Sequence, residues 1–324
     1  MSGSGTGAPQ EPATVSTRAA PIPIGQDRLG PDQRGPRWVG PGLPLLVIGG
    51  PCVLETPQIN ERIGTTLRDC CAALELPYVF KASFDKANRT SIHSPRGPGM
   101  EAGLAEIARL RERLGVPVTT DIHEPAQAAP AAAVVDLLQI PAFLCRQTDL
   151  LVAAGATGRP VNVKKGQFMA PAEMANVVQK LREAGARGVI LTERGTFFGY
   201  HRLVTDFIGL GDLMSLGSPV CFDVTHSTQL PGAGGTATAG RPDRAALLAR
   251  AAVAAGVDAI FLECHPEPAR SLSDSATALP LHEVPALLRS LAAIRSACSS
   301  ASPVAPGLDR LAEAAAAVRA APRS

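Results

Sequence analysis

Short apolar runs alternate with segments of helical periodicity between residues 43 and 298. The runs are rich in Val, Ile and Leu, which is typical of strands buried on both faces of a parallel sheet. The predicted strands are residues 45–49, 78–81, 116–121, 137–140, 161–164, 188–192, 220–223 and 259–263. Apolar residues at three- and four-residue spacing predict helices most clearly at residues 99–114, 171–186, 243–255 and 281–298. Eight strands alternating with helices predict an α/β fold, a single (β/α)8 TIM barrel.

The two ends of the chain differ from this pattern. Residues 1–42 are rich in Gly, Pro, Ser and Thr and have few apolar residues to bury, which predicts a disordered N-terminal arm. Residues 299–324 form an Ala-rich C-terminal tail. We therefore expect one folded domain, the barrel of residues 43–298.

Composition excludes several classes of protein. The net charge is +2, and no long basic stripe is present, so nucleic acid is not an expected partner. The apolar stretches are too short or too interrupted to cross a membrane, and the N-terminus lacks the pattern of a secretory signal. The seven cysteines have no framework spacing, which favours reduced thiols in a cytoplasmic protein.

Charged side chains follow the predicted strands at their carboxyl ends, where a barrel of this class carries its active site. A cationic set comes from the second, fifth and sixth strands: Lys81, Lys86, Arg89, Lys164 and Arg194. Ammonium and guanidinium groups gathered at one place indicate an anionic substrate, most simply a phosphate. This set is large enough for two phosphates, or for a phosphate and a carboxylate. A solvated basic loop is the alternative for the second strand alone.

A second set, from the first, seventh and eighth strands, consists of Cys52, His226, Glu263 and Asp274. A thiolate, an imidazole and two carboxylates suit a divalent metal, and the thiolate favours zinc or iron over magnesium. Their spacing alone is no signature. Cys52 could instead be a small buried hydrophobe, His226 could cap or pack, Glu263 could pair with a lysine, and Asp274 could belong to a turn. The Gly-rich residues 231–240 are interpreted as a mobile lid.

At these positions the chain closely resembles the 3-deoxy-D-manno-octulosonate 8-phosphate synthase family. The matching segments follow one another in order between residues 44 and 295. They are residues 80–90, 91–94, 96–99, 121–125, 139–143, 146–149, 162–165, 193–195, 198–200, 223–226 and 265–268. The resemblance implies a transferase of lipopolysaccharide biosynthesis that condenses phosphoenolpyruvate with arabinose 5-phosphate and water. It also implies a (β/α)8 barrel that is usually a homotetramer.

The resemblance also implies roles for individual residues. One branch of the family is metal-independent and carries Asn at the end of the first strand. The other is metal-dependent and carries Cys there, as Gly50-Pro-Cys52 does in this chain. Cys52, His226, Glu263 and Asp274 would then hold a divalent cation, either zinc, iron, manganese or cobalt. Phosphoenolpyruvate would be held by Lys81, Lys86, Gln139, Lys164 and Arg194.

For the second substrate, the resemblance implies that Asn88 and Arg89 bind the phosphate of the pentose and that Asp121 lies nearer the sugar. Arg146 would reach the site of an adjoining subunit. Lys86, His226 and Asp274 are the candidate catalytic residues, and the general base is left open among His226, Asp274 and a metal-bound water.

Two alternatives belong beside this interpretation. The sister family, 3-deoxy-D-arabino-heptulosonate 7-phosphate synthase, uses erythrose 4-phosphate and usually carries Lys-Pro-Arg-Thr after the second strand. This chain has Lys86-Ala-Asn-Arg89 there, and the extra Asn suits a longer aldose. The other alternative is a barrel that binds sugar phosphates without catalysis.

Overall fold

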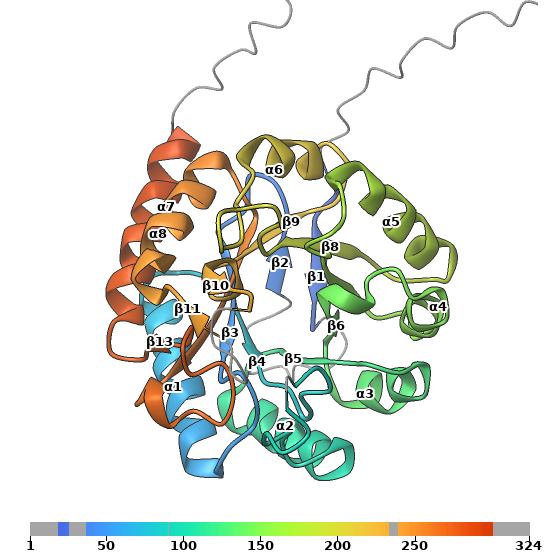
Figure 1. Cartoon of the computed structure of the whole chain (residues 1–324), viewed down its shortest axis with the longest axis vertical. Coiled ribbons are helices and arrows are strands. Elements are labelled where there is room, and N and C mark those ends of the chain that lie inside the picture. The colour runs from blue at the N-terminus through green and yellow to red at the C-terminus, as the bar shows by residue number, and fades with distance from the viewer. Residues whose placement is uncertain (1–18, 26–36, 90, 233–238, 301–324) are drawn as a thin grey trace, which may run out of the picture.

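A closed barrel of parallel strands forms the centre of the molecule (Figure 1). The computed structural model describes residues 19–25, 37–89, 91–232 and 239–300. The barrel in this part of the chain has eight strands, and β12 closes it by pairing with both β3 and β9. The strands are β3 (Leu46–Gly50), β4 (Tyr78–Lys81), β5 (Val118–Asp121), β6 (Leu137–Ile140), β7 (Val161–Lys164), β8 (Val189–Glu193), β9 (Val220–Asp223) and β12 (Ala259–His265).

A ring of helices surrounds the strands (Figure 1), so the predicted (β/α)8 barrel is confirmed. Local signals set several helix ends. The Thr56 hydroxyl accepts from the Ile59 N–H at the start of the first helix, and the second helix ends at Gly115, which adopts a φ of 63°. The helices are α1 (Pro57–Ala73), α2 (Met100–Leu114), α3 (Ala128–Val134), α4 (Thr148–Ala156), α5 (Met174–Glu183), α6 (Phe207–Met214), α7 (Ala245–Ala255) and α8 (Val284–Ser300).

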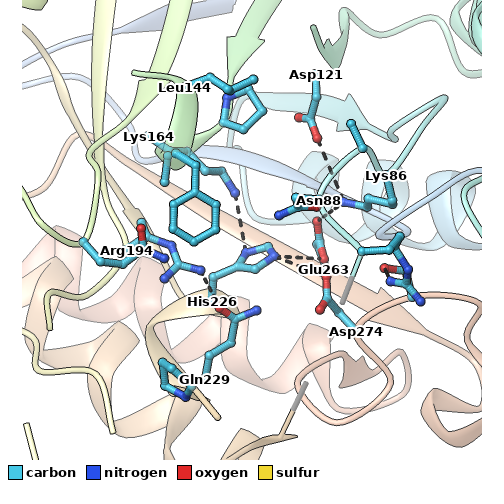
Figure 2. Close-up of a pocket in the computed structure, with 18 of the residues that line it drawn as sticks. Lys86, Asn88, Asp121, Leu144, Lys164, Arg194, His226, Gln229, Glu263 and Asp274 are labelled. Carbon is cyan, nitrogen blue, oxygen red and sulfur yellow. Dashed lines mark hydrogen bonds and ion pairs between the residues drawn. The ribbon is translucent and has the colours of Figure 1, made fainter. Parts of the chain in front are cut away.

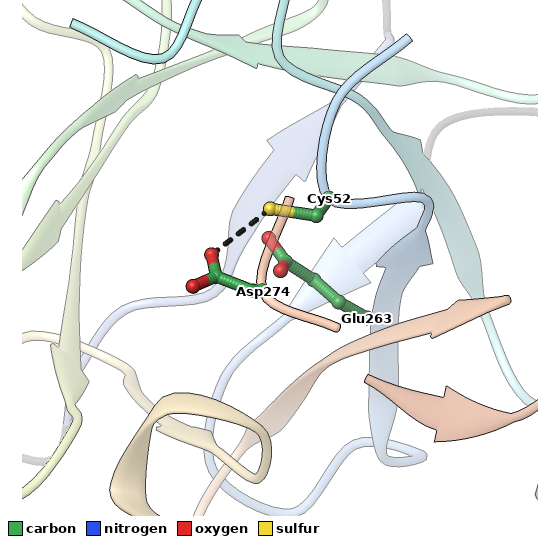
Figure 3. A group of neighbouring side chains, drawn as sticks. All are labelled: Cys52, Glu263 and Asp274. Atoms are coloured by element: carbon green, nitrogen blue, oxygen red, sulfur yellow. Dashed lines mark hydrogen bonds between the residues drawn. The ribbon is translucent and has the colours of Figure 1, made fainter. Parts of the chain in front are cut away.

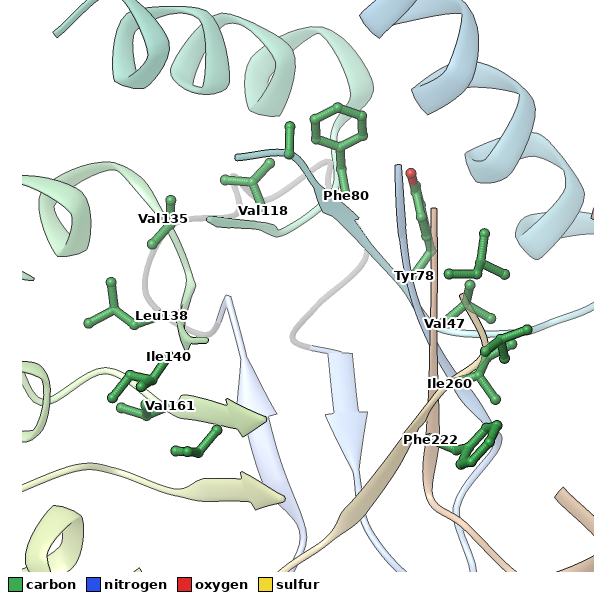
Figure 4. Packing of buried hydrophobic residues seen from close by; sticks show 14 of the residues in the cluster. Val47, Tyr78, Phe80, Val118, Val135, Leu138, Ile140, Val161, Phe222 and Ile260 are labelled. Atoms are coloured by element: carbon green, nitrogen blue, oxygen red, sulfur yellow. The ribbon is translucent and has the colours of Figure 1, made fainter. Parts of the chain in front are cut away.

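Side chains alternate along each strand between two cores. Outward residues such as Val47, Phe80 and Leu138 pack under the helices in a large apolar cluster (Figure 4). Inward residues form a second apolar cluster at the lower end of the barrel, including Ile48, Val79, Leu137, Ile190 and Phe261. The last inward position of most strands is polar instead. These residues are Lys81, Asp121, Gln139, Lys164, Thr192, Asp223 and Glu263.

An N-terminal hairpin closes the lower end of the barrel, and it corrects the predicted arm. Strands β1 (Ile22–Ile24) and β2 (Arg37–Val39) pair antiparallel, and Ile22, Ile24 and Val39 are buried in the lower apolar cluster. Ile22 lies against Gly188, which directly precedes β8. The prediction of a disordered arm is therefore wrong for residues 19–25 and 37–42, because the open end of the barrel supplies an apolar surface that composition does not reveal. Residues 1–18 and 26–36 lie outside the described residues.

Two other predicted segments fall partly outside the described residues. Strands β10 (Gln229–Leu230) and β11 (Ala239–Gly240) pair at the base of the predicted lid, and residues 233–238 within it are not described. The short strand β13 (Leu279–Pro280) pairs with β12, and α8 continues through residues 299 and 300, two residues past the predicted end of the domain. Residues 301–324 of the predicted tail lie outside the described residues. Across the described ranges, no helix combines the length and the apolar character that crossing a membrane requires.

The hairpin should contribute measurably to stability. Ile24 is fully buried, so Ile24→Ala removes apolar contacts and leaves a cavity at the base of the barrel. We expect a loss of about 2–5 kcal/mol in the free energy of unfolding, measured by chemical denaturation. Leu247→Ala, at a side chain 60% exposed on α7, is the control and should cost about 0.5 kcal/mol or less. Equal stability of the Ile24→Ala variant and the wild type would contradict a contribution of this hairpin to the free energy of unfolding.

Candidate active site

A cavity of about 530 Å³ opens above the polar layer, at the carboxyl ends of the strands (Figure 2). Its walls come from loops that are far apart in the sequence. Most of the predicted site residues line it: Lys86, Asn88, Arg89, Asp121, Gln139, Lys164, Arg194, His226, Glu263 and Asp274. Three predicted residues do not. Lys81 and Cys52 lie beside or beneath the cavity, and Arg146 is exposed outside the cavity of the single chain.

Lys81 and Glu263 form a buried ion pair under the cavity. The Lys81 ammonium lies 2.5 Å from Glu263 Oε1 and donates to the Cys52 carbonyl oxygen at 2.7 Å, and neither side chain is more than 1% exposed. Burial alone would raise the pKa of Glu263, but the ammonium of Lys81 and the imidazole of His226 lower it to about 2. Glu263 is therefore a carboxylate at neutral pH. Lys81, in turn, is occupied by this pair and does not reach the cavity.

Gly50 makes room for this arrangement. A Cβ at Gly50 would lie 1.9 Å from the Lys81 carbonyl oxygen, and Gly50 is the register partner of Glu263. Any larger residue would push β3 away from β4 and displace Cys52, which follows two residues later. The glycine is thus required by close approach of two backbones.

Lys86 extends from the loop after β4 to a point between two carboxylates (Figure 2). Its ammonium lies 4.0 Å from both Asp121 Oδ2 and Glu263 Oε1. Burial alone would lower the pKa of Lys86, but Cys52, Glu263 and Asp121 outweigh burial and hold the pKa well above its usual range. Asp121 also accepts from the Ser83 hydroxyl at 2.8 Å and from the Gln139 amide. Lys86 is therefore a fixed cation on the cavity wall.

Lys164 and His226 share the carboxylate of Asp223. Asp223 Oδ2 accepts from the Lys164 ammonium at 2.6 Å and lies 2.8 Å from His226 Nδ1. Asp223 Oδ1 also accepts from the backbone N–H of His226, which fixes the turn after β9. The Lys164 ammonium lies 3.5 Å from the centroid of the Phe261 ring, a cation–π contact. Burial alone would lower the pKa of His226, and the Asp223 carboxylate raises it above its ordinary value.

Arg194 enters the cavity with part of its guanidinium unused. Its Nη2 donates to Gln229 Oε1 at 2.5 Å, whereas its buried Nη1 has no hydrogen-bond partner among the described residues. Glu193 Oε1 accepts from the N–H groups of Arg194 and Gly195, which holds the turn that carries the guanidinium. A buried donor without a partner is costly, so this position suits a bound anion.

Three of the four predicted metal ligands form one close group, and His226 lies beside two of them. The ligand atoms of Cys52, Glu263 and Asp274 all lie within 4.8 Å of one another (Figure 3), and the Cys52 thiol donates to Asp274 Oδ2 at 3.0 Å. His226 Nε2 lies 3.6 Å from both Glu263 Oε2 and Asp274 Oδ2. Glu263 Oε2 is buried and has no hydrogen-bond donor in the described part of the chain. This donor set and its orphaned oxygen fit a divalent cation.

Arg89 and Asn88 lie at the more open end of the cavity. Arg89 Nη1 donates to the Ser273 hydroxyl at 2.7 Å and Nη2 to the Leu272 carbonyl oxygen at 3.3 Å, while Asn88 is exposed. Sequence reasoning missed Ser273 and also Gln229, the partner of Arg194. Gln229 follows His226 by three residues in a 3-10 turn, a spacing that could have placed it at the same site.

The environment of His226 generates a pH prediction for the metal-free protein. In Asp223→Asn the attraction of this carboxylate is lost, while burial, Lys164 and the Glu263 carboxylate remain, so the pKa of His226 should fall. The raised pKa stabilises the fold at low pH, and in the wild type this contribution is lost as pH rises through the folded pKa. The substitution should make this contribution smaller.

NMR titration of the histidine rings measures both pKa values. Asp258→Asn, at a buried aspartate whose carboxylate accepts from the Val220 N–H, is the matched control and should leave the pKa of His226 in place. An unchanged pKa in Asp223→Asn would show that the Asp223 contact does not control the imidazole.

Comparisons with known proteins identify the family of this chain. A model of the DAHP synthetase I family matches residues 22–298, a range that includes the hairpin strands. The 2-dehydro-3-deoxyphosphooctonate aldolase of a Cyanothece species is 54% identical over 80% of this chain and 95% of that protein. The protein of the same name from Desulfotalea psychrophila is 53% identical over 80% of this chain and 92% of that protein. The one from a Synechococcus species is 51% identical over 85% of this chain and 97% of that protein. The chain therefore belongs to the DAHP synthetase I family, within its group of 2-dehydro-3-deoxyphosphooctonate aldolases.

Proposed function

We propose that the protein condenses phosphoenolpyruvate with D-arabinose 5-phosphate and water, giving 3-deoxy-D-manno-octulosonate 8-phosphate and inorganic phosphate. The names of the curated relatives support this activity. One observation of the structure carries the proposal furthest. The same cavity holds a buried group of cations, Lys86, Lys164 and Arg194, and a separate guanidinium, Arg89, at its open end. Two anion sites on one cavity fit two phosphorylated substrates.

The buried cations are the proposed site of phosphoenolpyruvate. Arg194 Nη1 lacks a partner within the described residues, and Lys86 and Lys164 lie on the same cavity with their ammonium groups inward. Gln139 takes part by holding Asp121 and accepting from Asn162, which keeps this wall rigid. The resemblance implies that Lys81 binds phosphoenolpyruvate. In this proposal Lys81 instead orients Glu263 from below the cavity.

Positioning accounts for much of the proposed catalysis. A new bond forms between carbon 3 of phosphoenolpyruvate and the aldehyde carbon, and positive charge develops at carbon 2. Water adds at carbon 2, and the bond between carbon 2 and the phosphate oxygen then breaks. Holding both substrates by their phosphates turns a three-component encounter into an organised one. The ammonium of Lys86 opposes the negative charge that develops on the aldehyde oxygen. Asp274, at the rim beside His226, is placed to accept a proton from the attacking water.

We also propose that Cys52, His226, Glu263 and Asp274 hold a divalent cation. The orphaned Glu263 Oε2 and the convergence of a thiol with two carboxylates support this assignment. Burial raises the pKa of the Cys52 thiol, and the Asp274 and Glu263 carboxylates raise it further, so binding of a cation would release the thiol proton. The cation would supply Lewis-acid polarisation of the aldehyde or its hydroxyls. The sulfur ligand favours zinc or iron, and manganese or cobalt also suit the set.

The assembly is proposed to be a homotetramer that works in the cytoplasm and feeds lipopolysaccharide synthesis. Large apolar side chains are exposed near the start of α6 and in the loop before it: Phe198 is 96%, Tyr200 is 89% and Ile208 is 82% exposed. Such surfaces commonly mark association. Arg146, exposed after β6, stays the predicted contribution of one subunit to another.

Substrate length distinguishes this activity from that of the sister family. Erythrose 4-phosphate is one carbon shorter than arabinose 5-phosphate. With its phosphate anchored at Arg89, its aldehyde carbon therefore lies one carbon–carbon bond short of carbon 3 of phosphoenolpyruvate. We expect kcat/KM to favour arabinose 5-phosphate by about a hundredfold or more, measured by phosphate release. Equal use of both aldoses would move the chain to the sister activity, and release with neither would indicate a binding barrel.

Arg89→Ala should raise KM for the aldose far more than KM for phosphoenolpyruvate, because it removes a charge-assisted contact to one substrate only. Arg113→Ala, at an exposed arginine on α2 paired with Glu61, is the control. A defect confined to phosphoenolpyruvate would overturn the assignment of Arg89.

Removal of metal should abolish activity, and zinc, iron, manganese or cobalt should restore it to differing degrees. Cys52→Ala should lose the metal in elemental analysis, because the remaining ligands lack the thiolate. Cys71→Ala, at an equally buried cysteine in α1, should retain it. Full turnover by protein shown to be free of metal would place the chain in the metal-independent mode despite Cys52.

A further inference from the structure

The loop that carries Asp274 is held firmly on one side. The Leu272 N–H donates to Glu55 Oε1 at 3.1 Å, and the other oxygen of Glu55 lies 3.4 Å from His265 Nε2 on β12. The side chains of Glu55 and His265 are 7% and 4% exposed. This anchor belongs to the body of the barrel and involves none of the groups proposed to bind substrate.

The other side of the loop depends on Arg89. The guanidinium reaches the Ser273 hydroxyl at 2.7 Å and the Leu272 carbonyl oxygen at 3.3 Å, although 184 residues separate Arg89 from Ser273 in the sequence. Ser273 is only 2% exposed and directly precedes Asp274. The position of a proposed metal ligand thus depends on the side chain proposed to hold the aldose phosphate.

The backbone at Asp274 makes this support important. Asp274 has a φ of 50°, in the left-handed region, which residues other than glycine adopt infrequently, although aspartate does so more readily than most. Its carbonyl oxygen accepts from the N–H groups of Thr277 and Ala278, both at 2.9 Å, which holds the C-terminal side of the turn. The contact of Arg89 with Ser273 holds the N-terminal side.

The N–H donors of Arg89 determine whether phosphate binding keeps or breaks the contacts between Arg89 and the loop. A guanidinium has five N–H donors, and the two contacts to the loop use two of them. Nε is buried and has no hydrogen-bond partner in the described ranges. A phosphate can therefore bind through the remaining donors while the loop contacts stay in place. Binding would then immobilise Arg89 and, through it, the loop.

We propose that the contact between Arg89 and Ser273 couples the aldose-phosphate site to the metal site, with Ser273 as the positioning residue. This inference rests on the proposed function. Phosphate binding at Arg89 fixes Asp274 in its ligating position, so the aldose phosphate raises the affinity for the metal. By linkage, the metal raises the affinity for the aldose phosphate by the same factor.

Calorimetry on the full chain tests the coupling without turnover. The dissociation constant of Mn²⁺ is measured with and without saturating arabinose 5-phosphate, in the absence of phosphoenolpyruvate. We expect the sugar phosphate to tighten Mn²⁺ binding by roughly fivefold or more in the wild type. In Ser273→Ala the factor should fall clearly below the wild-type value, because the guanidinium loses its contact with the residue next to Asp274 and keeps only the one to the Leu272 carbonyl oxygen. A wild-type factor of 1, or a full factor in Ser273→Ala, would overturn the proposal.

Two matched variants separate coupling from folding. Ser275→Ala changes an exposed serine on the same loop and should keep the wild-type factor. Ser273→Thr retains the hydroxyl and should restore the factor that Ser273→Ala loses. Failure of Ser273→Thr to restore it, in protein that still binds Mn²⁺, would count against a role for the hydroxyl.

One further ligand tests the route in the wild type alone. Arabinitol 5-phosphate has the phosphate but no aldehyde, so it should still tighten Mn²⁺ binding if the coupling passes through Arg89. Loss of the effect with this ligand would show that the aldehyde itself contacts the metal and would overturn the route through Ser273. Phosphate release from phosphoenolpyruvate and arabinose 5-phosphate by the same preparation distinguishes failure of this inference from failure of the proposed function.

Discussion

The site depends on the pairing of opposite charges inside the top of the barrel. Burying an ammonium or a carboxylate alone costs several kcal/mol, so each charge needs a partner. The two closest pairs each join next-but-one strands: Lys81 on β4 reaches Glu263 on β12, and Lys164 on β7 reaches Asp223 on β9. The strand between carries a small side chain at that level, Gly50 in one case and Thr192 in the other. Strand register and side-chain size thus decide which charges meet.

These pairs leave selected polar atoms unsatisfied. Lys81 takes one oxygen of Glu263 and leaves the other without a donor in the described part of the chain, beside Cys52 and His226. Gln229 takes Nη2 of Arg194, and Nη1 has no hydrogen-bond partner among the residues that the structure describes. One orphan is an acceptor and the other is a donor. Taken together, they are complementary to a cation and to an anion, which agrees with the proposed metal and phosphoenolpyruvate sites.

Much of this arrangement could be predicted from the sequence, and the exceptions have physical causes. Strands buried on both faces are apolar throughout, so their positions and the residues at their ends are readable. The hairpin strands β1 and β2 have three residues each, and they are buried only because the barrel end covers them. Lys81 and Lys86 are both cations near the end of one strand. Their roles differ because side chains alternate along β4, and this alternation turns Lys81 inward, below the cavity. Ser273 and Gln229 are small or neutral, and only tertiary contacts reveal them.

The hairpin under the barrel also determines how molecules travel through the site. Ile24 and Val39 are fully buried against the lower apolar cluster, so that end offers no passage within the described structure. At the other end, exposed residues border the cavity on several sides, among them Asn88, Phe143, Pro231 and Ser275, while Lys164 and Arg194 are 7% and 5% exposed deeper inside. Within the described structure, substrates and product therefore share one opening, at the carboxyl ends of the strands. Under the proposed roles, Arg89 lies nearer that opening than Arg194 does. We therefore expect phosphoenolpyruvate to bind before the aldose, and the eight-carbon product to leave by the way the substrates entered.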